Sequence, residues 1–267
     1  MELAPLIRGL SREPRRPLPT HDPAIDALAP DTRAQLARIW ADRARSELGA
    51  GSGFAIVVTE LYALGADPKV LALATRAAHD EVKHAELCHL LACAYAGAHL
   101  SMPRPKRVGM PVHAGADDTL RAHLHVVGLS CINETIAAAF VEACLLHAEA
   151  PLVRAIQTEH LADEVEHARV GWAHLASIPP GPPGPPGAPR APRAAGAPVR
   201  AAVAAWVPRL IDANVAHWRD RIAALPAAGV PGHAYPPRPE MLAAVDRAVA
   251  ELVLPGFAHV GLAVPMR

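Results

Sequence analysis

The stretch that decides the fold is "DEVKHAEL" at residues 80–87, read together with its near copy "DEVEHARV" at residues 163–170. Each copy contains the pattern Glu-x-x-His, first as Glu81 and His84 and then as Glu164 and His167. Residues i and i+3 of an α-helix share a face, so each Glu and His would point the same way if both copies were helical. The repeat predicts that each copy supplies half of one site.

The composition favours an all-helical protein. Alanine and leucine dominate the chain, and aromatic residues make up only 4% of it. Runs of β-branched residues bounded by turn signals are nearly absent, which argues against strands. The 267 residues are enough to bury a substantial core. The formal net charge is zero, so we expect no general attraction to nucleic acid or to an anionic membrane.

The cysteines and the first residues predict a soluble, cytoplasmic protein. The four cysteines form no Cys-x-x-Cys pair and lie in apolar helical stretches, which is typical of reduced, buried thiols. The N-terminal residues lack the continuous apolar core of a signal peptide. No apolar run is long and charge-free enough to predict a membrane span, which needs about 20 such residues.

Turn and capping residues divide the chain into helices. We expect the first helix to begin at an Asp31 N-cap and to end near Gly65. The second begins after Asp67 and ends near Gly97, and a long proline-rich crossover leads to a third helix beginning near Asp117 or Asp118. Pro151 separates the third helix from a fourth, which ends near Ser177.

The chain therefore divides into four regions. Residues 1–30 form an N-terminal extension, and residues 31–177 form a four-helix bundle. A Pro/Gly-rich linker or surface loop follows at 178–198. Residues 199–267 hold two further helical patterns, the first kinked by Pro208, which would pack on the bundle or at a subunit contact.

Two further glutamates are expected at the height of the repeat. Antiparallel helices joined by a short turn place residues at equal height when the turn lies midway between them. The turn near residues 65–67 selects Glu47 as the partner of Glu81, because their midpoint is residue 64. Glu60 is excluded, because its midpoint with Glu81 lies inside the second helix. By the same reasoning, the break before Pro151 selects Glu134 as the partner of Glu164.

This pattern favours a metal site over a solvated helix face. A single Glu-x-x-His pair is usually surface charge, but two copies with matched partners in an all-helical chain fit a two-metal centre better. Asp80 and Asp163 precede the two glutamates, and we expect each to accept the free N–H of the histidine in the opposite hairpin. The alternative is that both aspartates lie on an exposed edge.

The pattern resembles the ferritin-like superfamily of non-haem di-iron, or iron–manganese, carboxylate proteins. The resemblance covers roughly residues 31–177 and implies a ferritin-like four-helix bundle with a long crossover between its second and third helices. It implies two bound iron ions, with an iron–manganese pair as the alternative, and Glu81 and Glu164 as the bridging residues. The ligands that it implies are Glu47, Glu81, His84, Glu134, Glu164 and His167.

Two features break the symmetry of the halves. His160 lies one turn before Glu164, where the first half has Ala77, and this spacing is similar to that of di-iron arylamine N-oxygenases. The alternative is a partly buried polar residue near the site. "ELGAGSGF" at residues 47–54 places three glycines after Glu47. This suggests a π-bulge or a substrate cavity at Gly51, Phe54 and Ala138, the alternative being a kink or close helix packing.

We therefore expect an oxidoreductase: a di-iron oxidase or monooxygenase that uses O₂ to oxidise a small organic substrate, with an amine as one candidate. Electrons would come from an external donor, because the chain has no flavin, nicotinamide or iron–sulfur motif. The alternatives are an iron-handling or peroxide-reducing protein and a non-catalytic interaction module. A homodimer is possible from the sequence, and we expect neither nucleic acid nor a membrane as a partner.

Overall fold

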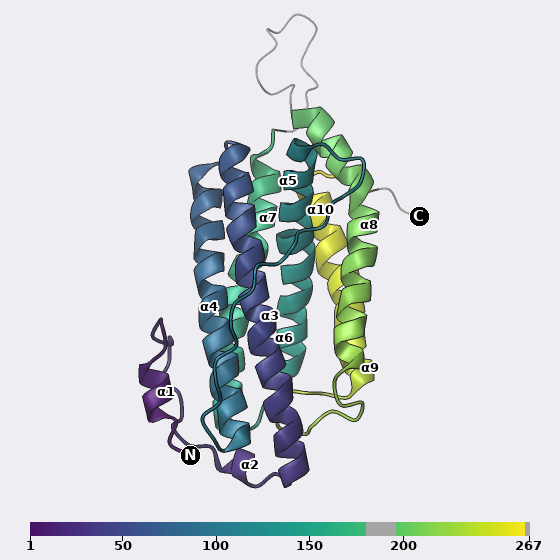
Figure 1. Cartoon of the computed structure of the whole chain (residues 1–267). Helices are drawn as coiled ribbons and strands as arrows, with labels where there is room; N and C mark the ends of the chain where they lie inside the picture. The colour runs from purple at the N-terminus through teal and green to yellow at the C-terminus, as the bar shows by residue number, and fades with distance from the viewer. Residues whose placement is uncertain (180–195, 265–267) are drawn as a thin grey trace, which may run out of the picture.

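The computed structural model describes residues 1–179 and 196–264, and within these ranges the protein is all-helical (Figure 1). The described residues contain no β-strand; their only extended pairings are two isolated bridges, Ala148 with His233 and Val230 with Tyr235. The all-α class predicted from composition is confirmed.

Four long helical segments run side by side and form the body of the molecule (Figure 1). The third is a continuous helix made of α5, the π-helical segment η1 and α6. The bounds are α3 (Pro30–Ala63), α4 (Pro68–Ala96), α5 (Asp118–Val126), η1 (Val127–Glu134), α6 (Thr135–Leu146) and α7 (Pro151–Ser177).

The capping residues explain most of these bounds. The Asp67 side chain accepts a hydrogen bond from the Lys69 amide at 2.7 Å, and Asp117 accepts one from the Leu120 amide at 2.7 Å. Each thereby satisfies an amide that a helix start leaves free. The prediction of Asp31 as an N-cap was wrong. Helix α3 begins at Pro30, whose ring presets the first helical φ, and Ala29 holds the cap position without a side-chain hydrogen bond.

The remaining elements flank the long helices (Figure 1). The connection between α4 and α5 runs along α3, where the Val108 amide donates to Ser52 Oγ at 3.1 Å. Two short helices precede α3, and the C-terminal helices pack against the third long segment. Their bounds are α1 (Ala4–Arg8), α2 (Pro23–Asp26), α8 (Gly196–Ala223), α9 (Arg238–Ala248), η3 (Val249–Val253) and α10 (Leu254–His259). Most of the proposed linker, residues 180–195, lies outside the described residues.

The third long segment is unusually apolar. By length and composition, Asp118–Leu146 could cross a membrane, which corrects the expectation that no segment of the chain would meet those criteria. Within the molecule, 72% of its most apolar window is buried. The apolar residues are therefore explained by packing, because this helix contacts α7, α8 and α9.

The π-helical turn η1 packs closely against α7. A Cβ built on Gly171 of α7 would lie 2.6 Å from Cys131 Sγ and 2.7 Å from the Cys131 amide nitrogen. Only glycine permits this approach without moving the backbone. The close packing positions the end of η1, where Glu134 lies.

Candidate metal centre

The two Glu-x-x-His motifs face each other from α4 and α7. His84 Nδ1 lies 3.5 Å from Glu81 Oε2 and 3.7 Å from Glu164 Oε1. His167 Nδ1 lies 3.2 Å from Glu81 Oε1 and 3.9 Å from Glu164 Oε2. Each glutamate therefore directs one carboxylate oxygen toward each histidine.

Glu47 from α3 and Glu134 from η1 complete the group, which we call the Glu/His cluster. Ligand atoms of Glu47, His84 and Glu164 lie within 4.8 Å of one another, and so do those of Glu81, Glu134, Glu164 and His167. All six side chains are buried. The structure brings together the four glutamates paired by helix height and the two histidines of the Glu-x-x-His motifs. Glu60, which the midpoint argument excludes, instead lies 2.7 Å from His125 Nδ1.

The cluster holds more carboxylates than its own histidines can balance. Burial and the neighbouring Glu81 carboxylate raise the pKa of Glu134 to about 7. Burial and the carboxylates of Glu134 and Glu81 raise the pKa of Glu164 well above its usual range. Burial alone would lower the pKa of His84, but Asp163 and Glu81 outweigh it and raise that pKa to about 9. Protons thus compensate charge that bound cations would otherwise balance.

Unpaired polar atoms indicate that the residues fit a metal ion. Several buried ligand-type atoms have no hydrogen-bond partner among the described residues: His84 Nδ1, His167 Nδ1, Glu81 Oε2, Glu164 Oε2 and His160 Nε2. A buried polar atom without a partner costs about 1–3 kcal/mol, more when it is charged. Imidazole nitrogens and carboxylate oxygens directed at one interior point are the donors that iron and manganese take in such helical proteins. The group could therefore hold a metal.

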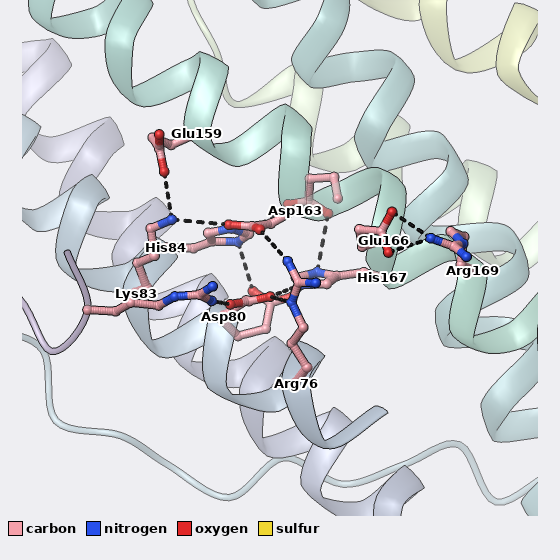
Figure 2. Close-up of polar contacts among 12 residues, drawn as sticks. Arg76, Asp80, Lys83, His84, Glu159, Asp163, Glu166, His167 and Arg169 are labelled. Carbon is pink, nitrogen blue, oxygen red and sulfur yellow. Dashed lines mark hydrogen bonds and ion pairs between the residues drawn. The ribbon is translucent and has the colours of Figure 1, made fainter. Parts of the chain in front are cut away.

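The two aspartates lie across the hairpins from the histidines (Figure 2). His84 Nε2 is 3.4 Å from Asp163 Oδ2, and His167 Nε2 is 3.7 Å from Asp80 Oδ2. Both aspartates are 0% exposed, so they do not lie on an exposed edge. Burial acts to raise the pKa of Asp163, but hydrogen bonds from His84 and Arg15 hold that pKa well below its usual range. The Asp163 contact is within hydrogen-bond distance, whereas His167 Nε2 has no hydrogen-bond partner among the described residues and faces Asp80 at ion-pair distance. In both cases the aspartate lies on the Nε2 side of the imidazole, which leaves Nδ1 facing the cluster.

His160 is buried beside the cluster but belongs to none of the metal-binding groups found among the described residues. Its ring lies 4.5 Å from the His84 ring, and its Nδ1 is 3.5 Å from Arg43 Nη2. Burial, together with the nearby charges of His84 and Arg43, lowers the pKa of His160 well below its usual range. His160 is therefore a neutral imidazole, and its role as a ligand stays a prediction.

A cavity of about 260 Å³ lies against the cluster. Its lining includes the four glutamates of the cluster, Glu47, Glu81, Glu134 and Glu164. Its walls come from α3, from the third long segment and from the C-terminal region, and they are largely apolar and aromatic. They include Ile39, Ala50, Ala137, Phe140, Trp218, Leu225 and Tyr235.

The cavity is not lined by the residues expected from the sequence. Gly51, Phe54 and Ala138 are not among its lining residues, although their neighbours Ala50 and Ala137 are. A Cβ on Gly51 would lie 3.2 Å from Glu81 Cβ, so this glycine allows close packing of α3 on α4. Phe54 packs against His167, with ring centroids 5.4 Å apart. The three glycines form no π-bulge, because α3 is α-helical throughout; the π-helical segments of the described residues are η1 and η3.

Sequence reasoning missed several side chains that support the cluster. Arg43 donates to Glu47 Oε1 at 3.0 Å, and its position one helical turn before Glu47 could have indicated this contact. Asn133 donates to Glu134 Oε1 at 3.0 Å and accepts a bond from Trp218 Nε1 at 3.0 Å. No sequence signal connects Trp218 of α8 with Glu134, because only the tertiary packing brings them together.

Comparison of the chain with protein-family models, with curated proteins and with solved structures finds no match.

Proposed function

We propose that this chain is a ferritin-like four-helix-bundle oxidoreductase that binds two iron ions, or an iron–manganese pair, and uses O₂ to oxidise a small organic molecule. One observation carries the proposal: four buried carboxylates and two imidazole Nδ1 atoms from four helical segments converge beside a cavity. Two divalent ions would balance the charge of the four carboxylates.

The distances favour Glu81 and Glu164 as the residues shared by the two ions. Each has one oxygen near His84 and the other near His167, so each could be shared between ions that the two histidines would hold. Glu47 would complete the ion on the His84 side, because it groups with His84 and Glu164. Glu134 would complete the ion on the His167 side, because it groups with Glu81, Glu164 and His167.

The cavity favours chemistry on an organic substrate. The bound metals would supply the electron transfer to O₂, while the chain positions the substrate. The aromatic rings of Phe140, Trp218 and Tyr235 offer apolar surface for binding it. All four cluster glutamates are among the lining residues, so a molecule bound in the cavity would lie beside the metal positions. Electrons would come from an external donor.

Metal loading followed by exposure to O₂ tests this proposal. We expect anaerobically purified protein to bind about two Fe²⁺ per chain. On mixing with O₂ it should form an oxidised product from a small organic compound; arylamines are the first to try, given the spacing of His160. Growth of an iron mineral core, or oxidation of Fe²⁺ that no organic compound alters, would contradict the oxidase assignment. Protein that binds no iron would contradict the metal centre.

A matched pair of variants tests the cavity. Ala137→Leu adds volume at a lining position, whereas Ala138→Leu adds the same volume at a neighbouring position that is not among the lining residues. We expect both variants to retain two metals, and only Ala137→Leu to lose product formation, by about tenfold or more. Equal product formation by the two variants would exclude this cavity as the substrate site.

A further inference from the structure

The N-terminal residues 11–16 bind the two aspartates behind the metal centre. Arg12 Nη1 pairs with Asp80 Oδ1, and Arg15 Nη2 pairs with Asp163 Oδ1. The other oxygen of each aspartate, Oδ2, faces a histidine of the cluster. Each aspartate thus connects one arginine of the N-terminal extension to one candidate ligand. We call Arg12 and Arg15 the arginine clasp.

Further contacts hold the clasp across the seam between α4 and α7. Ser11 donates to Glu86 Oε2 of α4 from its amide at 2.9 Å and from its hydroxyl at 2.8 Å. On the α7 side, Arg15 Nη1 lies 3.4 Å from Glu159 Oε2. The same Glu159 oxygen accepts a bond at 2.7 Å from Lys83, whose side chain is only 1% exposed. Figure 2 shows Lys83 between Glu159 and Asp163.

Arg76 lies between the two aspartates and provides a further cation. Its Nε is 3.2 Å from Asp80 Oδ2, and its Nη2 is 3.5 Å from Asp163 Oδ1. Arg76 and Lys83 come from α4 itself, whereas the two clasp arginines come from a segment outside the long helices. The Oδ1 atom of Asp80 has Arg12 as its only partner among the described ion pairs.

The contacts of Arg12 and Arg15 differ from ordinary surface ion pairs in the burial of their partners. Exposed pairs contribute about 0–1 kcal/mol, and the clasp arginines are themselves 37% exposed. Their partners, however, are fully buried carboxylates that contact candidate ligand histidines. A carboxylate that accepts the N–H of a ligand imidazole fixes its tautomer and ring orientation, and removing such groups typically weakens metal binding by about 10–100-fold. The position of the arginines therefore bears on the position of the imidazoles.

We propose that Arg12 and Arg15 are positioning residues of the metal centre. By holding Asp80 and Asp163 in place, they orient His167 and His84 and slow the loss of bound metal. This inference rests on the proposed function, because it assumes that the cluster binds metal. It assigns a role to the N-terminal extension, which the sequence patterns leave outside the bundle.

The test uses Co²⁺ as a visible stand-in for Fe²⁺ in the full chain. We would compare wild type with Arg12→Gln/Arg15→Gln, with the conservative Arg12→Lys/Arg15→Lys and with the control Arg8→Gln/Arg16→Gln. Arg8 and Arg16 form no ion pair within the described residues, so the control removes equal charge from the same region. The readouts are the ligand-field absorption of bound Co²⁺ and the rate of its transfer to a chelator.

We expect Arg12→Gln/Arg15→Gln to shift the absorption bands and to release Co²⁺ about 10-fold faster or more. The lysine variant should fall between it and wild type, and the control should match wild type. If the double glutamine variant does not fold, the single variants Arg12→Gln and Arg15→Gln serve in its place. Arg12→Gln should perturb His167 through Asp80, and Arg15→Gln should perturb His84 through Asp163.

Two outcomes would overturn the clasp, and they differ from a failure of the proposed function. If the glutamine variants show unchanged bands and release rates, the arginines do not act on the metal centre. If they lower only the melting temperature of the metal-free protein, their role is structural. Wild-type protein that takes up no Co²⁺ and no Fe²⁺ would overturn the metal centre itself, and the clasp with it.

Discussion

At the scale of single residues, Glu134 is a buried carboxylate whose charge a bound cation would balance. It is 2% exposed, and its one supporting contact from the third long segment is the neighbouring Asn133 amide. Its raised pKa reflects burial close to another carboxylate. A protein that only needed stability would replace such a residue with an apolar one, because an unpaired buried acid is costly.

Glu134→Gln should therefore separate metal binding from folding. The amide keeps the size of the side chain but removes its charge, so we expect bound Fe²⁺ to fall from about two ions per chain to about one. The metal-free variant should be at least as stable as wild type. Metal analysis and thermal unfolding would measure the two effects. Glu142→Gln, at an exposed position of α6, is the matched control and should retain full loading. Full loading of Glu134→Gln would contradict its role as a ligand.

Gly51 is the second residue whose role can be isolated. Alanine there would place its Cβ 3.2 Å from Glu81 Cβ, so Glu81 would have to move by a few tenths of an ångström. We expect Gly51→Ala to weaken metal binding by about 10-fold, measured by competition with a chelator. Gly53→Ala is the control, because its Cβ would meet Leu129 Cδ2 at an ordinary 3.6 Å. It should leave metal binding unchanged and stabilise α3 by up to about 1 kcal/mol.

At the scale of elements, the sequence predicts the helices and the heights of their acidic residues well. The Asp67 and Asp117 caps and the break at Pro151 mark helix bounds that the structure confirms. The choice of Glu47 over Glu60 needs only the position of one turn, since antiparallel helices rise equally per residue. Capping residues and helix breaks are enough to predict these features, because they depend on geometry within one helix or one turn.

The π-helical segment and the cavity could not be predicted in the same way. The wide turn of η1 packs against Gly171, which lies some forty residues further along the chain, and no local signal links the two. The cavity has walls from α8 and from the loop that holds Tyr235, and no motif near Glu134 refers to either. A volume enclosed by distant segments depends on tertiary packing, which helical periodicity does not encode.

A histidine pair between α5 and α7 predicts a dependence of stability on pH. His123 Nδ1 lies 2.9 Å from His174 Nε2. Burial, and to a smaller extent the charge of His123, lowers the pKa of His174 to about 4. In the unfolded chain a histidine titrates near 6.5. Between these two pKa values the unfolded chain binds more protons than the folded one. The free energy of unfolding therefore falls as the pH drops from about 6.5 toward about 4.

His174→Asn should reduce this acid sensitivity. We expect the melting temperature of the metal-free variant to decline less than that of wild type between about pH 7 and about pH 5. The reason is that the variant lacks one histidine whose pKa is lowered by folding. His79→Asn, at an exposed position of α4, should behave like wild type. Identical pH profiles for wild type and His174→Asn would show that the pair does not govern acid stability.

At the scale of the whole molecule, segments outside the four long helices reach the centre from two directions. The C-terminal region contributes Trp218 and Tyr235 to the cavity wall. The N-terminal extension contributes Arg12 and Arg15 to the aspartates behind the histidines. The long helices supply the six candidate ligands, and the terminal extensions supply side chains around them.

Arg200 of α8 joins three parts of the molecule. The residue is 7% exposed, and its guanidinium donates to the carbonyls of Leu175 at 2.9 Å and Ile178 at 3.3 Å, and also to that of Val260. These bonds satisfy carbonyls near the end of α7, which a helix terminus otherwise leaves free. They also tie the end of α7 to α8 and to the residues after α10.

Arg200→Met should destabilise the fold without altering the ligands. Losing three charge-assisted hydrogen bonds from a buried site should lower the free energy of unfolding by about 2–4 kcal/mol, measured by urea denaturation. Arg219→Gln removes an exposed ion pair with Asp246 and should change stability by about 0.5 kcal/mol or less. An equal effect of both substitutions would contradict the proposed anchoring role of Arg200.

The apolar third segment has a consequence for biosynthesis. Asp118–Leu146 leaves the ribosome before α7, α8 and α9, the later helices that pack against it. Until these helices are synthesised, the nascent chain exposes a hydrophobic segment of the kind that chaperones and the membrane-insertion machinery both recognise. A chain that terminates early, before α8, should therefore accumulate in aggregates or in the membrane fraction rather than as free protein.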